Sequence, residues 1–90
     1  MPLRESETKI LLALLAGGET PIMSLPKKAG LGSNAVYNSI RWLTDRGLVR
    51  ESREDVLPRR RFISLTDRGT KIAELLRDVE NNLQKSKLVS

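Results

Sequence analysis

Two short β-prone runs, LVRES at 48–52 and RRFISL at 60–65, constrain the fold of this 90-residue chain more than any other feature. A polar connection containing Pro58 joins them, so they predict a hairpin with a long loop. The rest of the chain is helical in composition, except for an extended link at 20–22, where Pro21 disfavours a helical Thr20. This pattern predicts a mainly α fold with a small β-hairpin (α+β), in one domain that spans residues 1–90.

Glycines and small polar residues mark where the helices begin and end. GG at 17–18, Gly30 and Gly47 are expected stops, and Ser24, Ser33 and Thr66 are expected N-caps. These signals predict helices at 3–16, 23–30, 33–46 and 66–86, a short strand at 20–22 and a hairpin at 47–65. The predicted order is α-β-α-α-β-β-α, with a long C-terminal helix.

Composition argues against several classes of function. The chain has no cysteine and no histidine, which removes thiolate metal sites, the commonest general base and the commonest zinc ligand. No acid–base constellation or phosphate loop appears, so we expect neither an enzyme nor a metal or cofactor. The longest apolar stretch, Ile10 to Ala16, is too short to cross a membrane, which predicts a cytoplasmic, nucleoid-associated protein. The net charge of +5 suits a nucleic-acid partner.

The predicted helix at 33–46 has two contrasting faces. At 100° per residue, Val36, Ile40 and Leu43 form one apolar stripe, which predicts a core face. The opposite face carries polar groups, with Tyr37 and Trp42 on its flanks: Asn34, Asn38, Arg41 and Asp45. Asn matches the hydrogen-bonding edge of adenine, and Arg matches that of guanine or a phosphate. The alternative is that this polar face is only solvated and that Tyr37 lies at the rim of the core.

The segment from Pro21 to Leu76 resembles the winged helix-turn-helix of MarR-type transcriptional regulators, with related arrangements in PadR-like and other small prokaryotic and archaeal families. The likeness rests on LTDRGLV at 43–49 and ISLTDRG at 63–69, joined by an arginine-bearing wing. It implies that helix 33–46 reads the major groove and that the hairpin reaches the DNA backbone or minor groove. The positions matching groove-facing residues of the family are Ser33, Asn34, Ala35, Tyr37, Asn38 and Arg41. The wing positions are Arg59, which matches the family's wing arginine, then Arg60 and Arg61, with Arg53 on the approach.

Two departures from the family pattern matter. Leu57 stands where the family commonly has an acidic residue that helps to fix the wing arginine, so this wing is expected either to be more mobile or to hold its arginines differently. Family members are also longer, with terminal helices that form a dimer and a ligand pocket. A small-molecule effector is therefore not expected here.

Three consecutive arginines, Arg59 to Arg61, repel one another unless something relieves the charge. Strand alternation would put Arg59 and Arg61 on one side and Arg60 with Phe62 on the other. We expect Arg59 and Arg60 to grip phosphates and Arg61 to bridge back to its own domain. The alternative is that the charges and Pro58 only protect an edge strand from aggregation.

The C-terminal helix carries an apolar seam, with Leu75 beside it: Ile72, Leu76, Val79 and Leu83. Its spacings of four, three and four suit a coiled-coil contact, and Leu83 and Leu88 extend past what a domain of this size buries. We therefore expect a homodimer through this helix. The alternative is a frayed polar tail.

Together these features favour a dimeric, sequence-specific double-stranded DNA-binding transcription regulator, most simply a repressor. The alternative is a winged-helix protein-interaction module that recruits a transcription or replication partner. Single-stranded nucleic acid is a weaker candidate, because stacking platforms need exposed aromatic residues and the chain has three in all.

Overall fold

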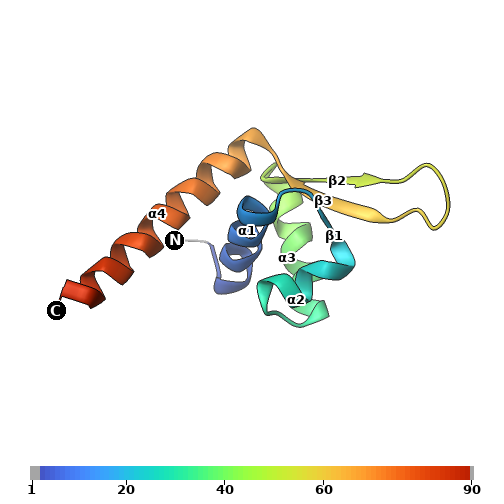
Figure 1. Ribbon diagram of the computed structural model, residues 1–90. Coiled ribbons are helices and arrows are strands. Elements are labelled where there is room, and N and C mark those ends of the chain that lie inside the picture. Colours follow the sequence, from blue (N-terminus) through green and yellow to red (C-terminus); the bar gives the residue numbers. More distant parts are fainter. Residues whose placement is uncertain (1–2, 90) are drawn as a thin grey trace.

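The computed structural model describes residues 3–89, and side chains up to residue 84. In this part of the chain, four α-helices pack beside a small sheet whose hairpin projects away from them (Figure 1). The helices are α1 (Glu5–Gly17), α2 (Leu25–Ala29), α3 (Ser33–Asp45) and α4 (Asp67–Val89), and a 3-10 turn, η1 (Ile22–Ser24), precedes α2. The strands are β1 (Thr20–Pro21), β2 (Val49–Arg53) and β3 (Arg61–Leu65). The predicted mainly α winged-helix fold and its element order are confirmed.

The core lies where α1, α3 and the start of α4 meet the sheet. Val36, Ile40 and Leu43 of α3 are buried there, as the helical spacing predicted. The other buried apolar residues of the core are Ile10, Leu11, Leu14, Ile22, Leu25, Leu48, Val49, Ile63 and Ala73. The hairpin and the C-terminal part of α4 extend from this core in opposite directions, which gives a body 53 Å long (Figure 1).

The sheet is antiparallel in the order β1-β3-β2, with β3 at its centre. Ile63 pairs with Thr20 on one side and with Glu51 on the other, and its side chain is fully buried. The β2–β3 hairpin is the wing. Its tip is closed by hydrogen bonds from the Glu54 N–H to the Arg60 carbonyl, 3.0 Å, and from the Arg59 N–H to the Val56 carbonyl, 2.8 Å.

Several predicted boundaries and caps were wrong by one or a few residues. α1 begins at Glu5 rather than Leu3, and the predicted helix at 23–30 is divided between η1 and a shorter α2. Ser33 is the first residue of α3, since the extended residue that precedes the helix is Gly32. Ser24 does precede α2 but makes no side-chain capping bond.

The N-cap of α4 is as predicted. The Thr66 hydroxyl oxygen accepts a hydrogen bond from the Gly69 N–H at 3.0 Å and donates one to the Gly47 carbonyl at 2.6 Å. One side chain therefore satisfies the start of α4 and ties it to the end of α3.

Gly47 ends α3 in a left-handed conformation, with φ 71°. The Leu48 N–H bonds to the Leu43 carbonyl and the Gly47 N–H to the Thr44 carbonyl, each at 3.0 Å. This is a Schellman motif, which favours glycine because a Cβ is costly at positive φ. The predicted stop at Gly47 is confirmed, and it directs the chain from α3 straight into the wing.

Candidate nucleic-acid interface

α3 presents a continuous polar face to solvent. Its exposed residues include Ser33, Asn34, Asn38, Arg41 and Asp45, while Ala35 is half-buried. Tyr37, on the flank of this face, has 44% of its surface exposed. The structure therefore brings together on one face the residues predicted to face the groove, with short side chains near the start of the helix.

The turn between α2 and α3 sets the direction of α3. Gly30 ends α2 in the left-handed region, and the Leu31 N–H bonds to the Pro26 carbonyl at 2.9 Å. Leu25 of α2 is fully buried, and Ala29 and Leu31 pack against the same core. α2 is therefore held by the core, and α3 follows it in a helix-turn-helix arrangement.

A buried polar contact anchors α3 to α1. The Ser39 hydroxyl donates to the Glu7 carboxylate at 3.0 Å, and each residue is only 4% exposed. The Arg4 N–H gives the same carboxylate a weaker bond at 3.4 Å. The predicted groove-facing residues did not include this pair. The sequence does indicate that both side chains face the core: Glu7 lies three and four residues before Ile10 and Leu11, and Ser39 adjoins Ile40 on the core stripe.

Trp42 lies on the other flank of α3 and is half-buried against the core. The Arg46 guanidinium stacks on its ring at 3.7 Å from the centroid. This cation–π contact fixes Arg46 at the end of α3.

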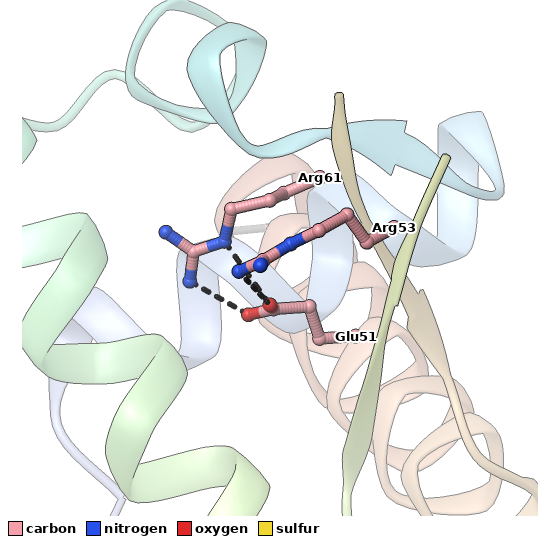
Figure 2. Close-up of polar contacts among 3 residues, drawn as sticks. All are labelled: Glu51, Arg53 and Arg61. Atoms are coloured by element: carbon pink, nitrogen blue, oxygen red, sulfur yellow. Dashed lines mark hydrogen bonds and ion pairs between the residues drawn. The ribbon is translucent and has the colours of Figure 1, made fainter. Parts of the chain in front are cut away.

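The three wing arginines differ in their partners. Arg61 donates two hydrogen bonds to the Glu51 carboxylate, from Nε at 3.0 Å and from Nη2 at 2.7 Å (Figure 2). Arg60 lies at 3.9 Å from the Glu54 carboxylate, a looser pair. Among the described residues, Arg59 makes no ion pair, and its φ is 53°. The expectation that Arg61 bridges back to its own domain agrees with this geometry.

The expected alternation of Arg59, Arg60 and Arg61 was wrong, because β3 begins only at Arg61. Arg59 and Arg60 belong to the loop at the wing tip, where the period of a strand does not apply. Leu57, at the position the family gives to an acidic residue, is exposed.

Glu51 is the centre of the charges at the base of the wing. Arg53 on the same strand also directs its guanidinium towards Glu51, at 3.8 Å (Figure 2). The hydrogen bond from Arg61, with the charges of both arginines, lowers the pKa of the Glu51 carboxyl despite some desolvation. The same hydrogen bond raises the pKa of Arg61. The pair is therefore charged at neutral pH.

A cleft of about 350 Å³ separates α3 from the wing. α3 contributes Tyr37, Arg41 and Asp45, and the wing contributes Glu51 and Arg61. The Arg61 guanidinium lies 6.0 Å from the centroid of the Tyr37 ring. The polar face of α3 and the base of the wing therefore line the same cleft.

The predicted seam of α4 divides into two parts. Ile72 and Leu76 pack against the domain's own core. Val79 and Leu83 are 54% and 63% exposed, and Leu75 is exposed beside them. Leu88 lies outside the residues whose side chains are described. The distal apolar residues Leu75, Val79 and Leu83 follow one side of the helix at four-residue spacing, and we call them the α4 stripe.

The described residues contain no group of three or more carboxylate, histidine or cysteine side chains placed to hold a metal ion. None of their helices is both long and apolar enough to cross a membrane.

Solved structures of MarR family regulators resemble this chain. One from Silicibacter pomeroyi has a TM-score of 0.83 at 24% identity over 99% of this chain and 58% of its own. One from Neisseria meningitidis has a TM-score of 0.80 at 21% identity, over 97% and 61% respectively. A transcriptional regulator homologue from Pyrococcus horikoshii has a TM-score of 0.74 at 21% identity, over 89% and 80%. The chain thus spans about three fifths of the first two proteins.

These likenesses confirm the MarR-like winged helix that the two TDRG motifs indicated. No protein of curated function matches the sequence. The family model described as sugar-specific transcriptional regulator TrmB matches residues 1–67, which include α1, the helix-turn-helix and the wing. The chain therefore belongs to the TrmB family of transcriptional regulators.

Proposed function

We propose that this winged-helix regulator binds double-stranded DNA sequence-specifically as a homodimer and represses transcription by occupying a promoter. The observation that carries the proposal is the shared cleft, which sets the polar face of α3 beside the wing. A duplex that accepts α3 in its major groove would meet the wing at the adjacent backbone or minor groove.

α3 has the chemistry to read bases. Ser33, Asn34 and Asn38 are short, exposed and uncharged, and Arg41 follows one turn later. Asn can bond both edge groups of adenine, and Arg those of guanine. Ala35 and Tyr37 offer apolar contact of the kind that a thymine methyl accepts. These side chains supply specificity in the proposal.

The wing supplies sequence-independent affinity. Arg59 and Arg60 are exposed at its tip, and Arg53 lies at the end of β2. Contacts to phosphates position a protein on DNA, whereas contacts to bases specify the site. Of the three consecutive arginines, Arg59 is the strongest candidate for a phosphate contact, because no carboxylate among the described residues forms an ion pair with it.

Dimerisation is proposed through the α4 stripe, which would remove exposed apolar surface from water. A two-fold dimer would give two α3 helices, for half-sites about one DNA turn apart. The sugar in the family's description is not assigned to this chain. The proposal includes no small-molecule effector, cofactor or enzymatic activity.

The test is binding of the full chain to a labelled duplex of random sequence, measured by fluorescence anisotropy from about 50 to 200 mM salt. If each subunit neutralises about four phosphates, log K for the dimer should fall against log salt with a slope of about −7. Selection from fragmented genomic DNA, followed by footprinting, should then yield a site with two related half-sites. Absence of binding at about 50 mM salt contradicts the proposal.

A pair of asparagine variants tests the role of α3. Asn38→Ala should weaken binding to the selected site by about 1–3 kcal/mol, with little effect on the random duplex. Asn81→Ala, the same change on exposed α4, is the control and should affect neither. Repression itself is tested by transcription in vitro from a promoter carrying the selected site, which should fall as the protein occupies it.

One observation favours the alternative, a protein-interaction module. Val56 and Leu57 at the wing tip are 69% and 82% exposed, and such apolar side chains suit a protein surface. The anisotropy measurement separates the two functions, because an interaction module needs no salt-dependent affinity for a random duplex.

A further inference from the structure

The cleft between α3 and the wing has a defined place in a DNA complex. This inference rests on the proposed DNA-binding function. If α3 occupies a major groove and the wing the adjacent minor groove, the sugar-phosphate strand between the grooves must pass the cleft. Groups that line the cleft therefore face phosphates, whatever the base sequence.

An acidic residue lies in this path. Glu51 lines the cleft, and its side chain keeps 30% of its surface exposed. A carboxylate in this place repels a passing phosphate. It also binds Arg61, whose Nε and Nη2 donate hydrogen bonds to the carboxylate at 3.0 and 2.7 Å. Arg53 is drawn to the same carboxylate at 3.8 Å.

Arg61 cannot bind a phosphate with the same edge while it holds Glu51. Two-point contacts between guanidinium and carboxylate are among the stronger charge-assisted hydrogen bonds, and a phosphate offers the guanidinium the same kind of acceptor. Capture of Arg61 by DNA would therefore exchange one such contact for another. It would also leave the Glu51 charge beside the DNA backbone.

We propose that Glu51 restrains sequence-independent DNA binding by occupying Arg61, and more loosely Arg53, in the cleft that DNA phosphates must pass. The three consecutive arginines then have graded roles, with Arg59 available, Arg60 loosely held and Arg61 withheld. This restraint would improve discrimination between the specific site and random DNA, because a genome offers a large excess of non-specific sites that compete for the protein.

The restraint by Glu51 should lower the affinity of non-specific complexes more than that of specific complexes. Base contacts hold a specific complex in one register, whereas a non-specific complex can shift until a released guanidinium meets a phosphate. Removing the Glu51 charge should therefore raise affinity for random DNA more than affinity for the selected site.

The experiment compares full-length variants on a random-sequence duplex and on the selected site, from about 50 to 200 mM salt. Glu51→Gln should bind the random duplex more tightly, with a salt slope steeper by about 0.9 for each released arginine that meets a phosphate. The ratio of the two affinities should fall. Glu74→Gln makes the same charge change on exposed α4 and should alter the slope little, since distant charges are screened over about 8–10 Å.

Two further variants identify the released arginine. Arg61→Gln combined with Glu51→Gln should restore the slope of the unsubstituted protein. Arg61→Gln alone should leave that slope nearly unchanged, a result that does not depend on the folding of Glu51→Gln.

A Glu51→Gln protein with an unchanged or shallower slope overturns the inference. So does Arg61→Gln alone if it flattens the slope by about one unit, as expected of an available arginine. If the unsubstituted protein does not bind DNA at about 50 mM salt, the proposed function fails and this inference fails with it. Normal binding without these variant effects overturns this inference alone.

Discussion

Gly69 of α4 lies directly against the carbonyl oxygen of Leu48, so closely that a Cβ atom at residue 69 would collide with it. The same carbonyl accepts a hydrogen bond from the Thr66 N–H at 3.1 Å, which holds α4 against the start of the wing. The glycines of the two TDRG motifs thus serve different ends. Gly47 provides a left-handed turn, and Gly69 permits a close approach of backbones.

Gly69→Ala should therefore destabilise the domain, although alanine is normally the better residue in a helix. Overpacking of this kind costs about 1–3 kcal/mol, and more if the backbone must separate. Gly17→Ala, at the exposed end of α1 where a Cβ meets only ordinary contacts, should have no such cost. Urea unfolding of both variants measures the difference. Equal stabilities would show that α4 can move away from Leu48 freely.

Ser39→Ala should leave the buried Glu7 carboxylate without its best donor. The cost of an unsatisfied buried acceptor is about 1–3 kcal/mol, and somewhat more for a charged one. Ser52→Ala removes a similar bond to Glu19, at 3.5 Å on the surface, and should cost under about 0.5 kcal/mol. Thermal unfolding of the two variants tests this, and a Ser39→Ala protein as stable as Ser52→Ala would refute it.

Arg59→Gln should weaken DNA binding to all sequences alike. Loss of one phosphate contact per subunit should flatten the salt slope by about 0.9 for each subunit. Arg77→Gln makes the same charge change on exposed α4, so it controls for net charge. Anisotropy titrations on random and selected duplexes provide the measurement. An effect confined to the selected site would assign Arg59 to base reading instead.

Val79→Asp should dissociate the proposed dimer, because it places a charge in the middle of the α4 stripe. An unpaired charge in an apolar interface should weaken self-association at least about tenfold. Asn81→Asp adds the same charge about 200° around the helix from Val79 and should leave the dimer intact. Sedimentation equilibrium distinguishes the two, together with a chain truncated after Val79. A monomeric unsubstituted protein would remove the dimer from the proposal.

The pH dependence of stability should include a contribution from Glu51. Its pKa is below the ordinary 4.5 because Arg61 hydrogen-bonds to the charged form. A carboxyl with a lowered folded-state pKa stabilises the fold above its unfolded pKa, and this contribution is lost as pH falls through the folded pKa. Asp45 and Arg41 of α3 are the other charged residues that line the same cleft.

Chemical denaturation between about pH 6 and pH 3 tests this linkage. The stability of the unsubstituted protein should fall more steeply than that of Glu51→Gln in the acid part of this range. Parallel curves would mean that the Glu51–Arg61 pair adds nothing measurable to the free energy of unfolding, which is common for exposed ion pairs.

Local rules predicted most of the fold because they act over a few residues. The spacing of Val36, Ile40 and Leu43 identified the core face of α3, and Gly47 marked its end, since both depend on residues within about two turns of helix. Boundaries failed where neighbouring geometry decided them. η1 takes the first turn of the predicted helix at 23–30, and Gly32 takes the extended position expected for Ser33.

The elements, the polar face of α3 and the three wing arginines could be predicted from periodicity, glycine and charge, which are properties of neighbouring residues. The contacts of these residues depend on how the elements pack in three dimensions. Pairing of β2 with β3 sets Glu51 beside Arg61, and packing of α1 on α3 sets Glu7 beside Ser39. Such contacts join residues distant in sequence, so no local pattern specifies which arginine is held by a carboxylate and which is not.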